Sequence, residues 1–328
     1  MATDTHQKSY AVGDILSLHT NSLDNAPRTL QAKIIQLYEP FTLSCVATVE
    51  INASDLGITD SPIEPAKAIL KLYDRRFASQ LRKESKIEPW TAATEEAYID
   101  IIKNGEAAEF VRKLNDDSID FEEPEEGWST AENEAYLHDK CSDLFSDETK
   151  AYDVMKTLQG KQIPRLYSAV SLPLEQSNLG EPLEQDSDLL SIPGISLEYI
   201  PGPTLSTMTD VIPRQSWQRI VEQAVQNVRA YSSLGFLNSD VRPSNFVVNE
   251  QVPDGHERRV VMLDFAVCEF REDDQSDEEW GRLKWREDEE NAVGCVMEGI
   301  LERLGFDLGY VRSSQWKKYA IPAEDVWS

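Results

Sequence analysis

The segment Gly235–Val248, GFLNSDVRPSNFVV, carries the residues on which the fold prediction depends. It places an acid, a base and an amide (Asp240, Arg242 and Asn245) in a loop between the end of a predicted helix and a short strand. A second apolar run then leads to Asp264. Carboxylate and amide oxygens at loop and strand ends suit a hard cation such as Mg²⁺, and an arginine between them suits a phosphoryl oxygen. The segment therefore predicts a site for a metal-bound phosphate.

Two motifs in this part of the chain resemble the protein kinase superfamily. DVRPSN at Asp240–Asn245 matches the family's catalytic loop, D-[LI]-[KR]-P-x-N, and DFA at Asp264–Ala266 is similar to its metal-binding D-F-G. The resemblance implies that Asp240 orients or deprotonates an acceptor hydroxyl and that Arg242 lies beside the transferred phosphoryl group. It also implies that Asn245 and Asp264 hold Mg²⁺.

A third motif, AILK at Ala68–Lys71, is similar to the kinase strand that ends in V-A-I-K. The resemblance implies that Lys71 contacts the α- and β-phosphates of ATP. The acidic partner of this lysine is predicted to be Glu148, with Glu132 and Glu134 as alternatives in a similar acidic helix. A lysine alone is more often a surface residue than a ligand, so the assignment of Lys71 as a nucleotide ligand depends on the other motifs.

A fourth motif, LEYI at the end of a predicted strand, resembles the segment that joins the two kinase lobes. The resemblance implies that the backbone at Glu198 and Ile200 pairs with adenine. The stretches KLYDRRFASQLR, LQGKQIPRLY and SLEYIPG are also similar to a group of fungal kinase-like proteins.

The order of the predicted elements agrees with the resemblance. We predict an α+β chain with a two-lobed protein-kinase-like fold, in which the two lobes form one kinase-like domain. Residues 1–200 form a β-rich N-lobe with a long helix and an acidic insertion at about 115–127, and residues 201–328 form a mostly helical, shortened C-lobe. The pattern predicts four longer strands at Phe41–Ile51, Ala66–Tyr73, Ile163–Val170 and Ile195–Ile200. It predicts helices at Trp90–Leu114, at Ser129–Leu158 with a capping box of Ser129 and Glu132, at 217–231 and at 293–304.

Because of four departures from the kinase pattern, the sequence does not decide between an active enzyme and a catalytically inactive protein. The early segment Tyr38–Ser44 has no glycine-rich loop, Asn238 replaces the family's histidine, and Ala266 replaces its glycine. The tail after Ala266 is short for a peptide-docking platform, and Trp285 and Asp288 are the residues expected to support the catalytic loop. The sequence thus indicates an ATP- and Mg²⁺-dependent phosphotransferase acting on a protein hydroxyl or a small molecule. The alternative is a pseudokinase that serves as a nucleotide-binding or non-catalytic interaction scaffold.

Charge excludes several partners. The formal net charge of −27 opposes binding to nucleic acid or to an anionic membrane, whereas the acidic loops suit a basic protein partner or substrate. The four cysteines and four histidines are scattered without zinc-ligand spacing. The N-terminal residues lack the apolar run of a secretory signal, and no stretch approaches the roughly 20 apolar residues that span a bilayer. We therefore expect a cytoplasmic or nuclear protein.

Overall fold

The computed structural model describes residues 10–21, 27–57, 65–116, 118, 121, 123–174, 188–250 and 258–320. Within these ranges, no helix has both the length and the apolar character that crossing a membrane requires. The chain divides into two compact units. The first unit contains Met1–Ser146 and Leu166–Tyr199, and the second contains Asp147–Arg165 and Ile200–Ser328.

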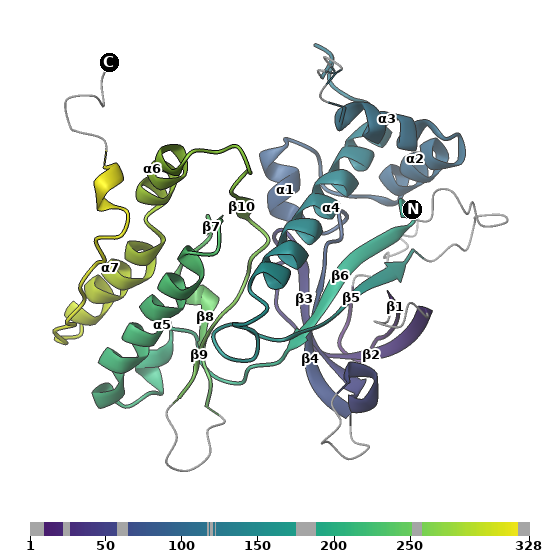
Figure 1. The fold of residues 1–328 in the computed structure, drawn as a ribbon. Coiled ribbons are helices and arrows are strands. Elements are labelled where there is room, and N and C mark those ends of the chain that lie inside the picture. Colours follow the sequence, from purple (N-terminus) through teal and green to yellow (C-terminus); the bar gives the residue numbers. More distant parts are fainter. Residues whose placement is uncertain are drawn as a thin grey trace. The chain divides into compact units, whose positions relative to one another are not determined.

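The first unit contains a closed antiparallel barrel with the strand order β1-β2-β3-β4-β6-β5 (Figure 1). Its strands are β1 (Ile15–Asn21), β2 (Pro27–Leu37), β3 (Cys45–Asn52), β4 (Pro65–Leu72), β5 (Leu166–Pro173) and β6 (Ser191–Glu198). The barrel closes where β1 pairs with β5, and the register there joins His19 to Ser171. Closure gives both edge strands a partner.

This barrel overturns the predicted fold class. The prediction of a two-lobed protein-kinase-like fold, with a β-rich N-lobe and a shortened helical C-lobe, is wrong, because the strands close into a barrel-like core. The physical reason is that β1 and β2, which the prediction did not include, extend the sheet until its two ends meet. The alternation of β2 is plain in the structure, since Leu30, Ala32 and Ile34 are buried and the residues between them, Gln31 and Lys33, are exposed.

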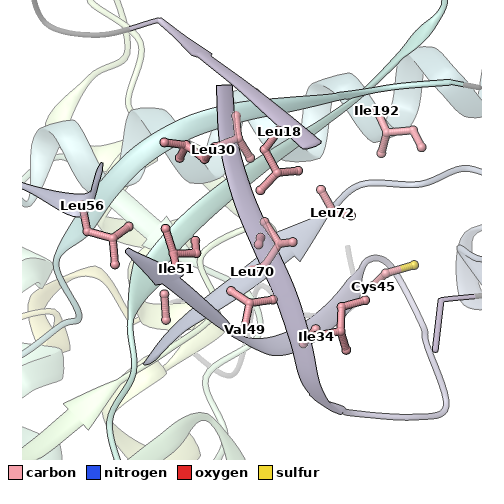
Figure 2. Packing of buried hydrophobic residues seen from close by; sticks show 14 residues of the cluster. Leu18, Leu30, Ile34, Cys45, Val49, Ile51, Leu56, Leu70, Leu72 and Ile192 are labelled. Carbon is pink, nitrogen blue, oxygen red and sulfur yellow. The ribbon is translucent and has the colours of Figure 1, made fainter. Parts of the chain in front are cut away.

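Apolar side chains from all parts of the barrel form its core (Figure 2). Because alternate residues of a strand point to one face, β2, β3 and β4 each contribute a row of buried side chains, and β1, β5 and β6 contribute one buried residue each. The buried residues labelled in Figure 2 are Leu18, Leu30, Ile34, Cys45, Val49, Ile51, Leu56, Leu70, Leu72 and Ile192. The core is thus built from segments that are far apart in the sequence.

The helices of the first unit differ partly from the prediction. They are α1 (Ser79–Glu84), α2 (Ala92–Lys103), α3 (Glu106–Leu114) and α4 (Thr130–Val154), and the boundary between the two units falls within α4. The single helix predicted at Trp90–Leu114 is divided at Gly105, whose positive φ of 74° ends α2 and starts α3. The capping box is confirmed, because Ser129 N–H donates to the Glu132 carboxylate (2.8 Å) and Glu132 N–H donates to the Ser129 hydroxyl (3.2 Å).

Besides the end of α4, the described part of the second unit contains three helices and four short strands. The helices are α5 (Trp217–Ser232), α6 (Asp277–Glu287) and α7 (Glu289–Glu302). The strands are β7 (Phe236–Asn238), β8 (Phe246–Val248), β9 (Val260–Met262) and β10 (Cys268–Phe270), with β7 paired to β10 and β8 to β9. The predicted apolar face of α5 is confirmed, because its residues from Trp217 to Tyr231 at helical spacing are buried.

The last predicted helix, 293–304, corresponds to α7. Asp288 has a left-handed backbone, with φ of 47°, and it separates α6 from α7. Val293 and Met297 of the predicted face are buried, whereas Val296 and Leu304 are exposed. The helical period therefore located α7 correctly and overestimated the width of its buried face.

Candidate functional site

The Asp240 loop, residues 239–245, follows the short strand β7, which comes after α5. Gly235 has a φ of 75°, a conformation that glycine adopts easily, and it turns the chain from α5 into β7. β7 then pairs with β10, and Ser239 N–H donates to the Val267 carbonyl (3.0 Å). The start of the loop is thus fixed to the segment that follows Asp264.

Three predicted site residues come together in this loop. The Asn245 amide donates to both the carbonyl and the carboxylate of Asp240, each at 2.9 Å. The Arg242 guanidinium lies 3.0 Å from the same carboxylate and donates weakly to the Asn245 side-chain oxygen at 3.4 Å. Pro243 begins the 3₁₀ turn Pro243–Asn245, and its fixed φ favours this geometry.

Hydrogen bonds of Asn238, Leu263 and Asn245 connect the Asp264 segment to the Asp240 loop. The Asn238 side-chain oxygen accepts from Asp240 N–H (2.9 Å), and its amide donates to the Asp264 carbonyl (3.1 Å). Leu263 N–H donates to the Asn245 carbonyl (2.7 Å). Asp264 itself has a positive φ of 66°, which is an uncommon conformation for a residue other than glycine and is frequent at functional sites.

The loop also rests on a buried ion pair that the sequence prediction missed. Asn238 N–H donates to the Glu289 carboxylate (2.9 Å), and that carboxylate is paired with Lys284. Lys284 also donates to the Phe236 carbonyl (3.0 Å). Burial lowers the pKa of Lys284, and the charge of Glu289 opposes that shift. The sequence prediction expected this support from Trp285 and Asp288. It missed Glu289, because one more glutamate in an acidic chain gives no distinct signal.

Glu148 contacts the segment that carries Asp264. It is fully buried, and its carboxylate accepts from Phe265 N–H at 3.4 Å. Phe265 is buried as well and packs edge-on against Tyr152, with ring centroids 5.6 Å apart. Glu148 therefore helps to hold the backbone next to Asp264, and its pairing with Lys71 stays a prediction.

The three residues predicted to contact the nucleotide are divided between the two units: Lys71 and Glu198 belong to the first and Ile200 to the second. Lys71 lies on β4 with 6% of its surface exposed, and its ammonium is 5.5 Å from the centre of the Tyr73 ring. Glu198 ends β6 in register with Ala68. Ile200 belongs to the second unit and is buried in an apolar cluster with Val247, Val261 and Leu263. Nucleotide binding by Lys71, Glu198 and Ile200 stays a prediction.

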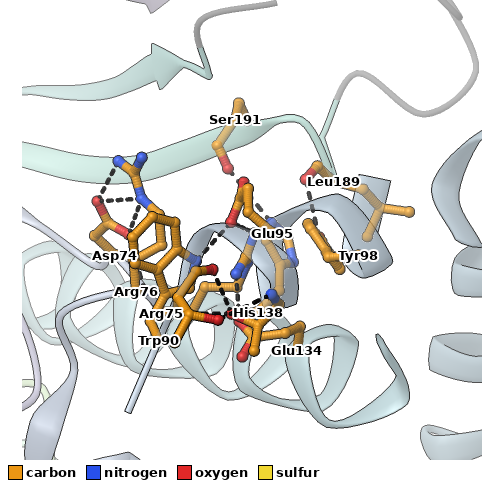
Figure 3. Close-up of polar contacts among 12 residues, drawn as sticks. Asp74, Arg75, Arg76, Trp90, Glu95, Tyr98, Glu134, His138, Leu189 and Ser191 are labelled. Atoms are coloured by element: carbon orange, nitrogen blue, oxygen red, sulfur yellow. Dashed lines mark hydrogen bonds and ion pairs between the residues drawn. The ribbon is translucent and has the colours of Figure 1, made fainter. Parts of the chain in front are cut away.

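The two alternative glutamates have other partners in the structure. Glu132 forms the capping box of α4. Glu134 is buried in the first unit and accepts from Arg82 (2.8 Å) and from Arg75 (Figure 3).

This Arg75 cluster extends further. Glu95 accepts from Arg75 (2.7 Å) and from the Trp90 indole (2.8 Å), and the Arg75 guanidinium lies 3.9 Å from the centre of the Tyr98 ring (Figure 3). In this cluster of Arg75, Arg82, Glu95 and Glu134, two positive charges are paired with two negative charges.

The donor chemistry of the Asp240 loop fits a hard cation. Asp240, Asn245 and Asp264 offer carboxylate and amide oxygens, which are the ligands that Mg²⁺ prefers. Across the described ranges, no group of three or more histidine, cysteine and acidic side chains forms a metal cage. No protein-family model matches the chain, and comparison with curated proteins gave no match.

Proposed function

We propose that the protein transfers the γ-phosphoryl group of ATP to a hydroxyl acceptor at the Asp240 loop, with Mg²⁺ as cofactor. One observation carries the proposal: a carboxylate, a guanidinium and an amide from Asp240, Arg242 and Asn245 are hydrogen-bonded to one another within six residues. Phosphoryl transfer depends on positioning and charge neutralisation more than on covalent chemistry. The loop offers a carboxylate that would position the acceptor hydroxyl and a guanidinium that would neutralise phosphate charge.

Each residue has a defined task in the proposed reaction. The acceptor oxygen attacks the γ-phosphorus, the bond to the bridging β–γ oxygen breaks, and ADP leaves with that electron pair. The acceptor proton passes to the Asp240 carboxylate, whose side chain is 31% exposed and therefore within reach of a substrate. Arg242 is 59% exposed and would place positive charge beside the transferred group.

Asn245 and Asp264 are the residues that would hold Mg²⁺, which neutralises phosphate charge when it is bound. Lys71 would contact the α- and β-phosphates with Glu148 as its acidic partner, and the backbone at Glu198 and Ile200 would pair with adenine. The acceptor would be a protein hydroxyl or a small molecule.

A thermal-melting experiment tests nucleotide binding. A ligand that binds only the folded state stabilises it by mass action, so millimolar ATP with Mg²⁺ should raise the Tm. Asp264→Asn should remove most of the metal-dependent part of the shift, and the exposed Asp277→Asn serves as a matched control. Absence of any shift in the parent protein would reject the proposal.

A non-catalytic scaffold is the second candidate, and one contact favours it. The Arg242 guanidinium already lies 3.0 Å from the Asp240 carboxylate, the group that would otherwise receive the proton. A scaffold of this kind would bind nucleotide or a basic protein partner without turnover. Transfer of labelled phosphate that Asp240→Ala abolishes would decide for the enzyme, and binding without transfer would decide for the scaffold.

We also propose a cytoplasmic or nuclear location. The four cysteines are all free thiols, and three of them, Cys45, Cys141 and Cys268, are buried. Free thiols of this kind are usual in reducing compartments. Localisation of a tagged full-length chain by microscopy tests this, and secretion into the medium would contradict it.

A further inference from the structure

A groove lies beside α3 in the first unit, far along the chain from the Asp240 loop. It has a volume of about 380 Å³. Phe110 and Phe121 supply its apolar lining, and Glu106, Glu109, Glu132 and Lys113 supply its charged lining. This α3 groove plays no part in the proposed reaction, so its chemistry is independent of phosphoryl transfer.

The apolar floor of the groove is held by aromatic packing. Phe110 is 6% exposed, and its ring centre lies 5.7 Å from that of Phe121 and 5.3 Å from that of Trp128, both edge-on. Phe121 itself is only partly buried. An aromatic floor of this kind offers a face on which a planar cation or an aliphatic stem can lie.

The charged lining, or rim, of the groove is mostly acidic, with Glu106, Glu109 and Glu132 against Lys113. In the sequence, residues 104–132 contain ten acidic residues and two basic ones, Arg112 and Lys113. Both basic side chains are already paired with Glu109, at 2.9 Å and 3.4 Å. Glu106 is exposed at the first turn of α3. The negative charge of this segment is therefore far from neutralised by its own basic residues.

We propose that the α3 groove binds a basic segment of a partner protein, with an arginine side chain on the Phe110–Phe121 floor and further basic residues against the acidic rim. Arginine fits better than lysine, because its planar guanidinium stacks on aromatic rings and is less strongly hydrated. A second copy of this chain is repelled, since each copy carries a net charge of −27. Nucleic acid is repelled by the same rim.

The test uses fluorescein-labelled Arg-Gly repeat and Lys-Gly repeat peptides, whose residues have no hydroxyl side chain. It is run without ATP, so it cannot report phosphoryl transfer. Anisotropy at about 0.15 M salt suppresses long-range attraction to the overall charge. The full chain should bind the arginine peptide more tightly than the lysine peptide. Failure to bind the arginine peptide overturns the proposal.

One variant and one matched control test whether the peptide binds at the groove. Glu106→Lys should raise the Kd of the arginine peptide about tenfold, because it places a positive charge at the rim. Glu302→Lys makes the same change on an exposed helical position of α7 and should change the Kd less than about twofold. Equal effects would show binding to the overall field and overturn the groove.

Phe121→Ala tests the aromatic floor. It should abolish the preference for arginine over lysine while leaving the charged rim in place. Circular dichroism confirms that each variant is folded. A preference that survives in folded Phe121→Ala overturns the assignment of arginine to this floor.

Discussion

Two polar clusters of the molecule use the same kinds of side chain in opposite ways. In the Arg75 cluster of the first unit, Glu134 is 1% exposed and lies between two buried arginines. In the Asp240 loop of the second unit, Asp240 and Arg242 form a similar pair, yet both remain open to solvent. A buried pair fixes the structure around it, whereas an exposed pair contributes little to stability and stays accessible to a substrate.

The largest effect is expected from breaking the buried cluster. Glu134→Gln leaves Arg75 and Arg82 without their shared anion, so the free energy of unfolding should fall by about 3–5 kcal/mol. Urea denaturation measures this change, with the exposed Glu96→Gln as control. A loss below about 1 kcal/mol would show that the cluster is not structural.

The Asp240 loop should behave in the opposite way. If the proposed reaction is correct, Asp240→Asn should lower kcat about 10²–10³-fold, because it removes the group that accepts the proton. The free energy of unfolding should change by less than about 1 kcal/mol, since the pair is exposed. Rate measurements at saturating ATP and urea denaturation separate the two, with Asp274→Asn as the matched control.

The pH dependence of stability tests a residue of the first unit, His138. Burial, and next the charge of Arg75, lower the pKa of His138 to about 4. Its Nε2 faces the carbonyls of Asp188 and Ser191, and its ring stacks on Tyr98.

The sign follows from proton binding. Between about pH 6.5 and pH 4 the unfolded chain binds a proton at this histidine and the folded chain does not, so stability falls as the pH falls. The expected slope is at most about 1.4 kcal/mol per pH unit. His138→Gln should remove this part of the slope in urea denaturation curves, and equal slopes in both proteins would refute the assignment.

Asn238 shares features of both clusters, because it is buried and its side chain is hydrogen-bonded to the Asp240 loop. Asn238→Asp keeps the acceptor for Asp240 N–H and loses the donor to the Asp264 carbonyl. We expect kcat to fall about tenfold, less than in Asp240→Asn, with little change in KM. Recovery of the parent rate in a folded variant would show that this hydrogen bond does not position Asp264.

The smallest effect is expected at a fully exposed ion pair. Arg112 contacts Glu109 and Asp116 on the surface of α3. In urea denaturation, Arg112→Ala should have the same midpoint as the parent protein within experimental error, because exposed ion pairs are screened by solvent. A loss comparable with that of Glu134→Gln would mean that burial does not decide the worth of these pairs.

Local features of the fold could be predicted from the sequence, and its closure could not. The buried face of α5 and the capping box at Ser129 depend on residues three or four positions apart, which a pattern records directly. The alternation of β2 at Leu30, Ala32 and Ile34 was also present and was missed. The pairing of His19 with Ser171 depends on two distant segments meeting, and no local period encodes it.

The same limit applies to the candidate site. The motif DVRPSN predicted that Asp240, Arg242 and Asn245 lie together, because they share one short loop. It did not predict the contact of Asn238 with Glu289, since the two residues come from separate elements and a glutamate in an acidic chain gives no distinct signal. Whether Lys71 serves the same site depends on similarly distant segments.

The closure of the barrel also bears on self-association. In the described residues, the register between β1 and β5 is a single pair, whereas β3 and β4 are in register along their full length. If the barrel opens, it should open at this seam, and two strand edges would then be exposed as templates for another chain. Conditions that loosen the seam should therefore promote aggregation before they unfold α5 or the Asp240 loop.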